Sequence, residues 1–135
     1  MANILLVEDE PLVSETLASA MKSKGHTVVT AANGVEGLNR FAERPFDLVV
    51  TDIIMPDKEG IEMILEMRRN KPEAKIIAIS GGGRTGNVEF LKMAASLGAM
   101  ATLKKPIRLA EFLTVLNDCL VRTPGEPKAA SSQAG

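Results

Sequence analysis

The sequence is poor in several residue types that binding and catalytic sites commonly use. Its 135 residues include no Trp or Tyr, four Phe, one cysteine and one histidine. The lone Cys119 excludes an internal disulfide and a cysteine-based zinc cluster, and the lone His26 excludes any metal site or catalytic scheme that needs two imidazoles. With so few aromatics the core has to be aliphatic, and little surface remains for stacking bases or sugars. The available chemistry is that of carboxylates, hydroxyls, amines and the backbone.

The sequence also lacks an excess of charge and a long apolar run. Sixteen Lys and Arg against seventeen Asp and Glu give a formal charge of −1, which argues against a nucleic-acid binder with a generally basic surface. No apolar run approaches the roughly 20 residues of a membrane span, and the amino terminus lacks a charged-then-apolar signal pattern. We therefore expect one cytoplasmic domain without direct nucleic-acid or membrane contact.

Short apolar runs alternate with helix-period segments along most of the chain. Continuous β-branched runs predict strands buried on both faces, at 4–7, 48–50 and 76–79. More polar runs predict edge strands, at 26–31 and 100–103. Amphipathic patterns predict helices, from Pro11 to before Gly25 and over 34–43, 60–70, 86–97 and 109–121. This alternation predicts an α/β fold with a parallel sheet. Residues 122–135, rich in Pro, Gly, Ala and Ser, predict a disordered tail after a domain spanning 1–121.

Acids, a hydroxyl and lysines follow the predicted strands at the point where each strand ends. These residues are Glu8, Asp9 and Glu10, Asp52, Ser80, and Lys104 and Lys105. Because the carboxyl ends of parallel strands share one edge of the sheet, we expect these side chains to lie close together. Clustered carboxylates persist only if they are solvated, protonated or neutralised, and Mg²⁺ suits all-oxygen ligands. The pattern favours phosphoryl transfer with a carboxylate as nucleophile.

Five motifs in this order resemble the response-regulator receiver domain of the CheY-like type. They are Leu6-Val7-Glu8-Asp9-Glu10, Asp52-Ile53-Ile54-Met55-Pro56 followed by Gly60, Ile79-Ser80-Gly81, Gly98-Ala99 and Lys105-Pro106. The resemblance covers about residues 3–120. It implies a doubly wound, flavodoxin-like sheet of five parallel strands in the order 2-1-3-4-5, with five helices.

The resemblance also implies roles for individual residues. Asp52 would accept a phosphoryl group from a phosphohistidine. Mg²⁺ would be held by Asp9, Asp52 and the backbone carbonyl of Ile54, with Glu8 acting through the outer shell. Lys105 would pair with the phosphoryl group, and its peptide bond to Pro106 would be cis. Ser80 would move toward the new phosphoryl oxygen.

One position departs from the family pattern. Thr102 stands three residues before Lys105, where the family usually has an inward-turning Tyr or Phe. We therefore expect the signal to pass through Ser80, a mobile glycine-rich loop over 81–86 and the fourth helix. That helix has a second apolar stripe containing Phe90, Met93 and Leu97, which predicts a contact surface. The resemblance implies that the fifth strand and fifth helix contribute to this surface.

The resulting hypothesis is a stand-alone receiver of a two-component system or phosphorelay. Its partners would be a sensor histidine kinase or histidine phosphotransfer protein and a downstream protein, and it would be a monomer or weak homodimer without substrate turnover. Three alternatives stay open. A Mg²⁺-dependent phosphohydrolase generally needs a second acid two residues after the nucleophile, where this chain has Ile54. A flavodoxin-like cofactor binder needs aromatic residues around the flavin and a phosphate-binding loop after the first strand. A non-phosphorylated receiver-like adaptor is the third. The Gly81-x-Gly83-x-x-Gly86 pattern only formally matches a dinucleotide fingerprint, since it does not belong to the first strand–helix unit.

Overall fold

The helices and strands alternate along the chain, as the sequence pattern predicts. The computed structural model describes residues 2–53, 59–80, 95–96 and 98–122. The elements in these ranges are β1 (Asn3–Val7), α1 (Pro11–Ser23), β2 (Thr27–Ala31), α2 (Gly34–Glu43), β3 (Leu48–Asp52), α3 (Glu59–Asn70), β4 (Ile76–Ser80), β5 (Ala101–Lys104) and α5 (Leu109–Val121).

The five strands form one parallel sheet in the order β2-β1-β3-β4-β5, which confirms the predicted order and the two predicted edge strands. The chain crosses over after β2, so β1 and β3 lie side by side in the middle. Val7 of β1 is in register with Thr51 of β3, and Asp52 is in register with Ile79 of β4. The ends of the three central strands therefore meet at one edge of the sheet, beside the point where strand order reverses.

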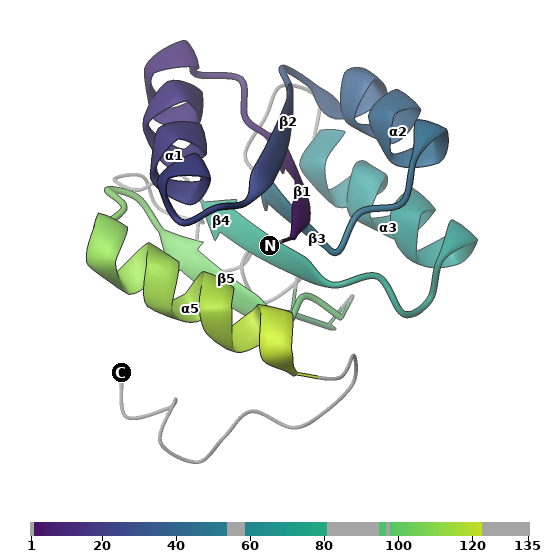
Figure 1. Ribbon diagram of the computed structural model, residues 1–135. Coiled ribbons are helices and arrows are strands. Elements are labelled where there is room, and N and C mark those ends of the chain that lie inside the picture. Colours follow the sequence, from purple (N-terminus) through teal and green to yellow (C-terminus); the bar gives the residue numbers. More distant parts are fainter. Residues whose placement is uncertain (1, 54–58, 81–94, 97, 123–135) are drawn as a thin grey trace.

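Helices cover both faces of the sheet, with α1 and α5 on one side and α2 and α3 on the other (Figure 1). The strand pleat sorts the core accordingly, because successive side chains point to opposite faces. Ile4 and Leu6 pack in the cluster with Phe112 of α5, whereas Leu5 and Val7 pack in the cluster with Ile64 of α3. These four side chains are fully buried, which explains why residues 4–7 are a continuous apolar run.

Local sequence signals place the helix ends. Pro11 begins α1, where its missing N–H costs no hydrogen bond, and Gly25 follows the helix with φ 92°. Asn33 caps α2, its side chain accepting a hydrogen bond from the Glu36 N–H at 2.8 Å. None of the helices in the described ranges has the length and apolar character needed to cross a membrane.

A few predicted boundaries shift in the structure. The second strand begins at Thr27, the fifth covers Ala101–Lys104 and the third helix begins at Glu59, each one residue from its predicted limit. Arg122, assigned to the tail by composition, is instead buried, and its guanidinium hydrogen-bonds the Met100 carbonyl. The domain thus includes at least residue 122. The predicted loop over 81–86 and most of the fourth helix, with Phe90, Met93 and Leu97, lie outside the described residues.

Candidate functional site

The backbone brings Glu8 and Asp52 together at the carboxyl edge of the sheet. The Glu8 N–H donates to the Ala31 carbonyl at 3.0 Å, and the Ile53 N–H donates to the Ile79 carbonyl at 2.8 Å. These two bonds continue the parallel ladders one residue past β1 and β3. The first residue after each of these strands is therefore still hydrogen-bonded to the neighbouring strand.

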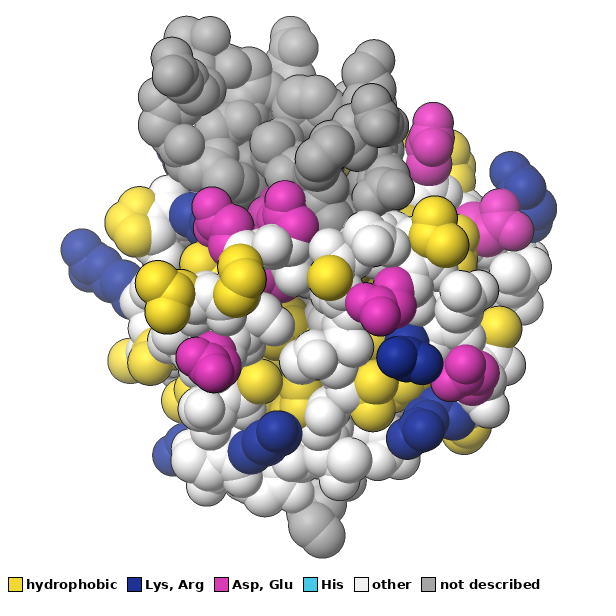
Figure 2. Space-filling model, turned by 90° about the horizontal axis from the view of Figure 1, so that it is seen from above, with side chains coloured by type: hydrophobic (Ala, Val, Ile, Leu, Met, Phe, Trp, Pro, Cys, Tyr) yellow, Lys and Arg dark blue, Asp and Glu magenta, His cyan; other side chains and the backbone are white. Residues whose placement is uncertain are grey.

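Three carboxylates gather at this edge. One carboxylate oxygen from each of Glu8, Asp9 and Asp52 lies within 4.8 Å of the others. Glu8 and Asp52 are buried, with exposed fractions of 3% and 2%, and Asp9 is exposed. Figure 2 looks down on this end of the molecule, where acidic side chains lie next to the residues drawn in grey. The predicted acidic cluster is therefore present.

Among the residues that the structure describes, one ammonium group lies between these acids. Lys105 Nζ is 3.0 Å from Asp52 Oδ2, 3.1 Å from Glu8 Oε2 and 3.1 Å from Glu10 Oε1. The Lys105 side chain is 14% exposed, and the Lys105–Pro106 peptide bond is cis, as predicted. Lys104, the other member of the basic pair, is exposed at the end of β5.

Burial and charge change the protonation of two of these groups. Burial raises the pKa of Glu8 from 4.5 to about 7; the nearby Asp52 charge adds to this, while the Glu10 N–H and Lys105 oppose it. Burial alone would lower the pKa of Lys105, but its hydrogen bond and charge pairing with Asp52, and its contacts with Glu10 and Glu8, outweigh burial and raise it. The pKa of Glu8 rises even though the Lys105 ammonium lies beside it, because one ammonium cannot neutralise every carboxylate around it.

The donor set fits a hard divalent cation. All candidate ligands are carboxylate oxygens, the type that Mg²⁺ prefers. Glu8 Oε1 is buried and has no hydrogen-bond partner among the residues that the structure describes, although a buried polar atom ordinarily has one. An added positive charge would compensate this oxygen and the excess of acids. Ile54, whose carbonyl is the further predicted ligand, lies outside the described residues.

The remaining predicted residues have separate outcomes. Ser80 ends β4, and its backbone is in register with Lys104. Thr102 is half-buried in β5, opposite Ala78. His26 has a structural role, because its Nδ1 accepts a hydrogen bond from the Ala2 N–H at 3.1 Å. Cys119 is buried in the core, as predicted.

Glu10 was expected at this edge with the other acids that follow the strands, but its contact with Lys105 was not predicted. It lies next to two predicted metal-site acids, and an acid before a helix is ordinarily read as a cap. Its carboxylate instead contacts Lys105 from the opposite end of the sequence. Only the pairing of strands across the sheet reveals this contact.

Comparison with known proteins agrees with this geometry. The response regulator receiver domain family matches residues 4–117, and the chain belongs to this family, which acts in two-component signalling. It is 36% identical over 121 residues to the sensor kinase CckA of Brucella abortus, covering 88% of this chain and 12% of the kinase. It is 32% identical over 135 residues to the DNA-binding transcriptional regulator NtrC of Azospirillum brasilense, covering 99% of this chain and 27% of the regulator.

A solved structure has the same fold over nearly its whole length. The receiver domain protein from Clostridium thermocellum superposes with a TM-score of 0.81 at 27% identity, covering 89% of this chain and 94% of that one. The CheY-like fold is therefore confirmed.

The family and the curated relatives indicate the kinds of partner that receiver domains have. Receiver domains interact with histidine kinases and downstream effectors, and this chain spans only a fraction of the two curated relatives. Because one of them is a DNA-binding regulator, the expectation that nucleic acid plays no part has no support.

Proposed function

We propose that this receiver accepts a phosphoryl group on Asp52 from a phosphohistidine of a sensor kinase or phosphotransfer protein. The observation that carries the proposal is the buried Asp52 carboxylate, held 3.0 Å from the Lys105 ammonium within a cluster of acids. A buried carboxylate paired with a cation and facing an open edge of a sheet suits a nucleophile for phosphoryl transfer.

The chemistry requires one bond to form as another breaks. A carboxylate oxygen of Asp52 forms an O–P bond while the N–P bond of phosphohistidine breaks, and the imidazole leaves with the electrons of that bond. Charge spreads over the phosphoryl oxygens in the transition state, where the Lys105 ammonium offers a fixed positive charge. Because burial limits solvation, this charge acts more strongly than it would in water.

The acids beside Asp52 have a different role. Asp9 and Asp52 would hold Mg²⁺, with Glu8 beside them, and the ion supplies positive charge that offsets repulsion between the carboxylates and the incoming phosphoryl group. Glu8 Oε1, which has no hydrogen-bond partner within the described part of the chain, supports this assignment.

The signal would leave the domain by protein–protein contact. Phosphorylation would shift an equilibrium between two conformations, because only one of them places the surrounding groups well for a bound phosphoryl group. Ser80 is the candidate reporter of that change. We expect a phosphoacceptor that loses its phosphoryl group slowly, without a separate substrate.

Intact-mass measurement after incubation with acetyl phosphate and Mg²⁺ tests the proposal. The wild-type chain should gain one phosphate, and Asp52→Asn should gain none. Asp118→Asn removes an acid on α5 far from the sheet edge and should label as the wild type does. Chelation of Mg²⁺ should strongly reduce labelling. An adduct that persists in Asp52→Asn, or a wild-type chain that gains none, would show that the proposal is wrong.

A further inference from the structure

Lys105 has no spare hydrogen-bond donor in this structure. An ammonium group carries three N–H donors, and Nζ has three carboxylate acceptors, on Asp52, Glu8 and Glu10. A phosphoryl group on Asp52 that pairs with Lys105 has to take a donor from one of these acceptors. The identity of the acceptor that yields therefore affects how readily the phosphoryl group is bound.

The three acceptors differ in what they lose on release. The side chains of Glu8 and Asp52 are 1% and 3% exposed, whereas that of Glu10 is 61% exposed. A buried carboxylate that loses its cation has no water to replace it, and the cost is large. The Glu10 carboxylate is solvated as soon as it lets go, so its contact with Lys105 is the cheapest to break.

Glu10 makes this contact in place of the local role that its position suggests. It is the N-cap residue of α1, yet its side chain makes no capping hydrogen bond. Only its backbone supports the local structure: its N–H donates to Glu8 Oε2 at 3.1 Å, and its carbonyl accepts from the Ser14 N–H at 2.9 Å. A change of the Glu10 side chain would leave both of these bonds in place.

We propose that Glu10 is a positioning residue that holds Lys105 in the unphosphorylated state and competes with the phosphoryl group for its ammonium. This inference rests on the proposed function, since it concerns the same site. Glu10 thereby sets how tightly the site binds a phosphoryl group, while Asp52 determines whether the group is bound at all.

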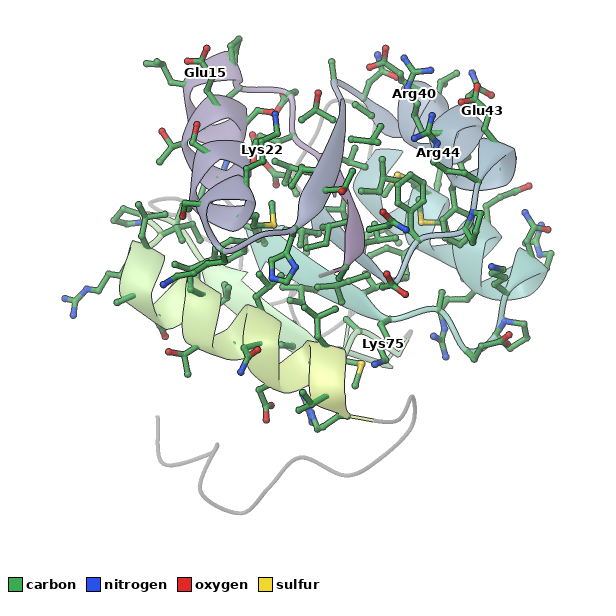
Figure 3. All side chains as sticks on the ribbon, in the orientation of Figure 1. Glu15, Lys22, Arg40, Glu43, Arg44 and Lys75 are labelled. Atoms are coloured by element: carbon green, nitrogen blue, oxygen red, sulfur yellow. The ribbon has the colours of Figure 1, made fainter. Side chains whose placement is uncertain are left out.

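The matched variants are Glu10→Gln and Glu15→Gln. Each variant removes one negative charge, and the two positions are only five residues apart in the sequence. Glu15, however, is exposed on α1 and points away from the sheet (Figure 3). The probe is beryllofluoride, an anion that mimics a phosphoryl group on a carboxylate, titrated in the presence of Mg²⁺. The rate of phosphorylation by acetyl phosphate and the thermal midpoint are measured on the same proteins.

Glu10→Gln should bind beryllofluoride about two- to five-fold more tightly than Glu15→Gln and should be phosphorylated faster by a similar factor, as expected for the loss of one partly exposed ion pair. Its thermal midpoint should stay level or fall by no more than about 5 °C, because a negative charge at a helix N-terminus is lost. A residue with only a structural role would weaken both binding and stability.

Equal or weaker beryllofluoride binding in Glu10→Gln than in Glu15→Gln would overturn this inference. The proposed function would still stand in that case if the wild-type chain is phosphorylated and Asp52→Asn is not. Absence of labelling in the wild type would instead overturn the proposed function.

Discussion

The two edges of the sheet carry similar side chains with opposite arrangements. At the amino edge, where the strands begin, three polar side chains meet backbone groups. His26 Nδ1 and Asp47 Oδ2 accept from the N–H groups of Ala2 and Asn3, and Lys75 Nζ donates to the Leu120 carbonyl. Lys75 lies near the amino ends of β3 and β4 and near α5 (Figure 3). At the carboxyl edge, side chains meet one another, and three acids surround the Lys105 ammonium.

The difference separates structural polar groups from functional ones. A polar or charged side chain bonded to a backbone group of opposite polarity stabilises the ends of the strands. A buried cluster of like charges is costly to hold, and it persists at sites that act on a charged ligand. We therefore expect substitutions at the amino edge to change stability alone, and substitutions at the carboxyl edge to change ligand binding and pH dependence.

The largest expected difference between the edges is in the pH dependence of stability. Glu8 has a pKa of about 7 in the folded chain and an ordinary value of 4.5 when unfolded, so the folded state retains its proton between these values. The contribution of Glu8 is greatest below about pH 4.5 and is lost as the pH rises through 7, up to about 3 kcal/mol of unfolding free energy.

Urea unfolding without Mg²⁺ at about pH 5 and about pH 8 measures this effect. The wild type should lose stability relative to Glu8→Gln between the two values, whereas Glu15→Gln should follow the wild type. If the wild type and Glu8→Gln show parallel pH profiles, the pKa of the buried Glu8 carboxyl is not raised as expected.

The two lysines give the next largest contrast. Lys105→Met should weaken beryllofluoride binding by about ten-fold or more, because a hydrogen bond between charged groups is lost. Lys75→Met should leave that binding unchanged and lower the unfolding free energy by about 1 kcal/mol, because the Leu120 carbonyl loses its donor. A large loss of beryllofluoride binding in Lys75→Met would remove the distinction between the edges.

The smallest expected effect belongs to Asp47. Asp47→Ala removes the acceptor 2.7 Å from the Asn3 N–H and should lower the unfolding free energy by about 1 kcal/mol. Amide exchange at Asn3 should become faster, while binding of beryllofluoride stays as in the wild type. Glu43→Ala, which breaks only an exposed ion pair on α2, is the control and should change stability by less than about 0.5 kcal/mol.

Much of the fold follows from patterns that are local in the sequence. Apolar runs such as 4–7 and 76–79 identify the buried strands because both of their faces need apolar partners. Pro11 and Gly25 bracket α1 through their backbone preferences alone. The tail boundary could not be placed in this way, because Arg122 is held by the Met100 carbonyl and by the carboxylate of Asp118, contacts that composition does not reveal.

The candidate site also has one part that the sequence predicts and one part that it does not. Its membership was predictable, since strand ends in a parallel sheet share one edge, and Glu8, Asp9, Asp52 and Lys105 all stand at such ends. The contact between Glu10 and Lys105 was not, because it joins residues 95 positions apart through the direction of two side chains.

Which residues form strands and helices, and which acids stand at the carboxyl edge, thus follows from the amino-acid sequence alone, because both depend on local periodicity and on the common direction of parallel strands. How the charges are shared depends on the three-dimensional packing. Burial of Glu8 and Asp52 and the reach of Lys105 across the sheet depend on packing between distant segments, and these set the pKa of Glu8 and the partners of the ammonium.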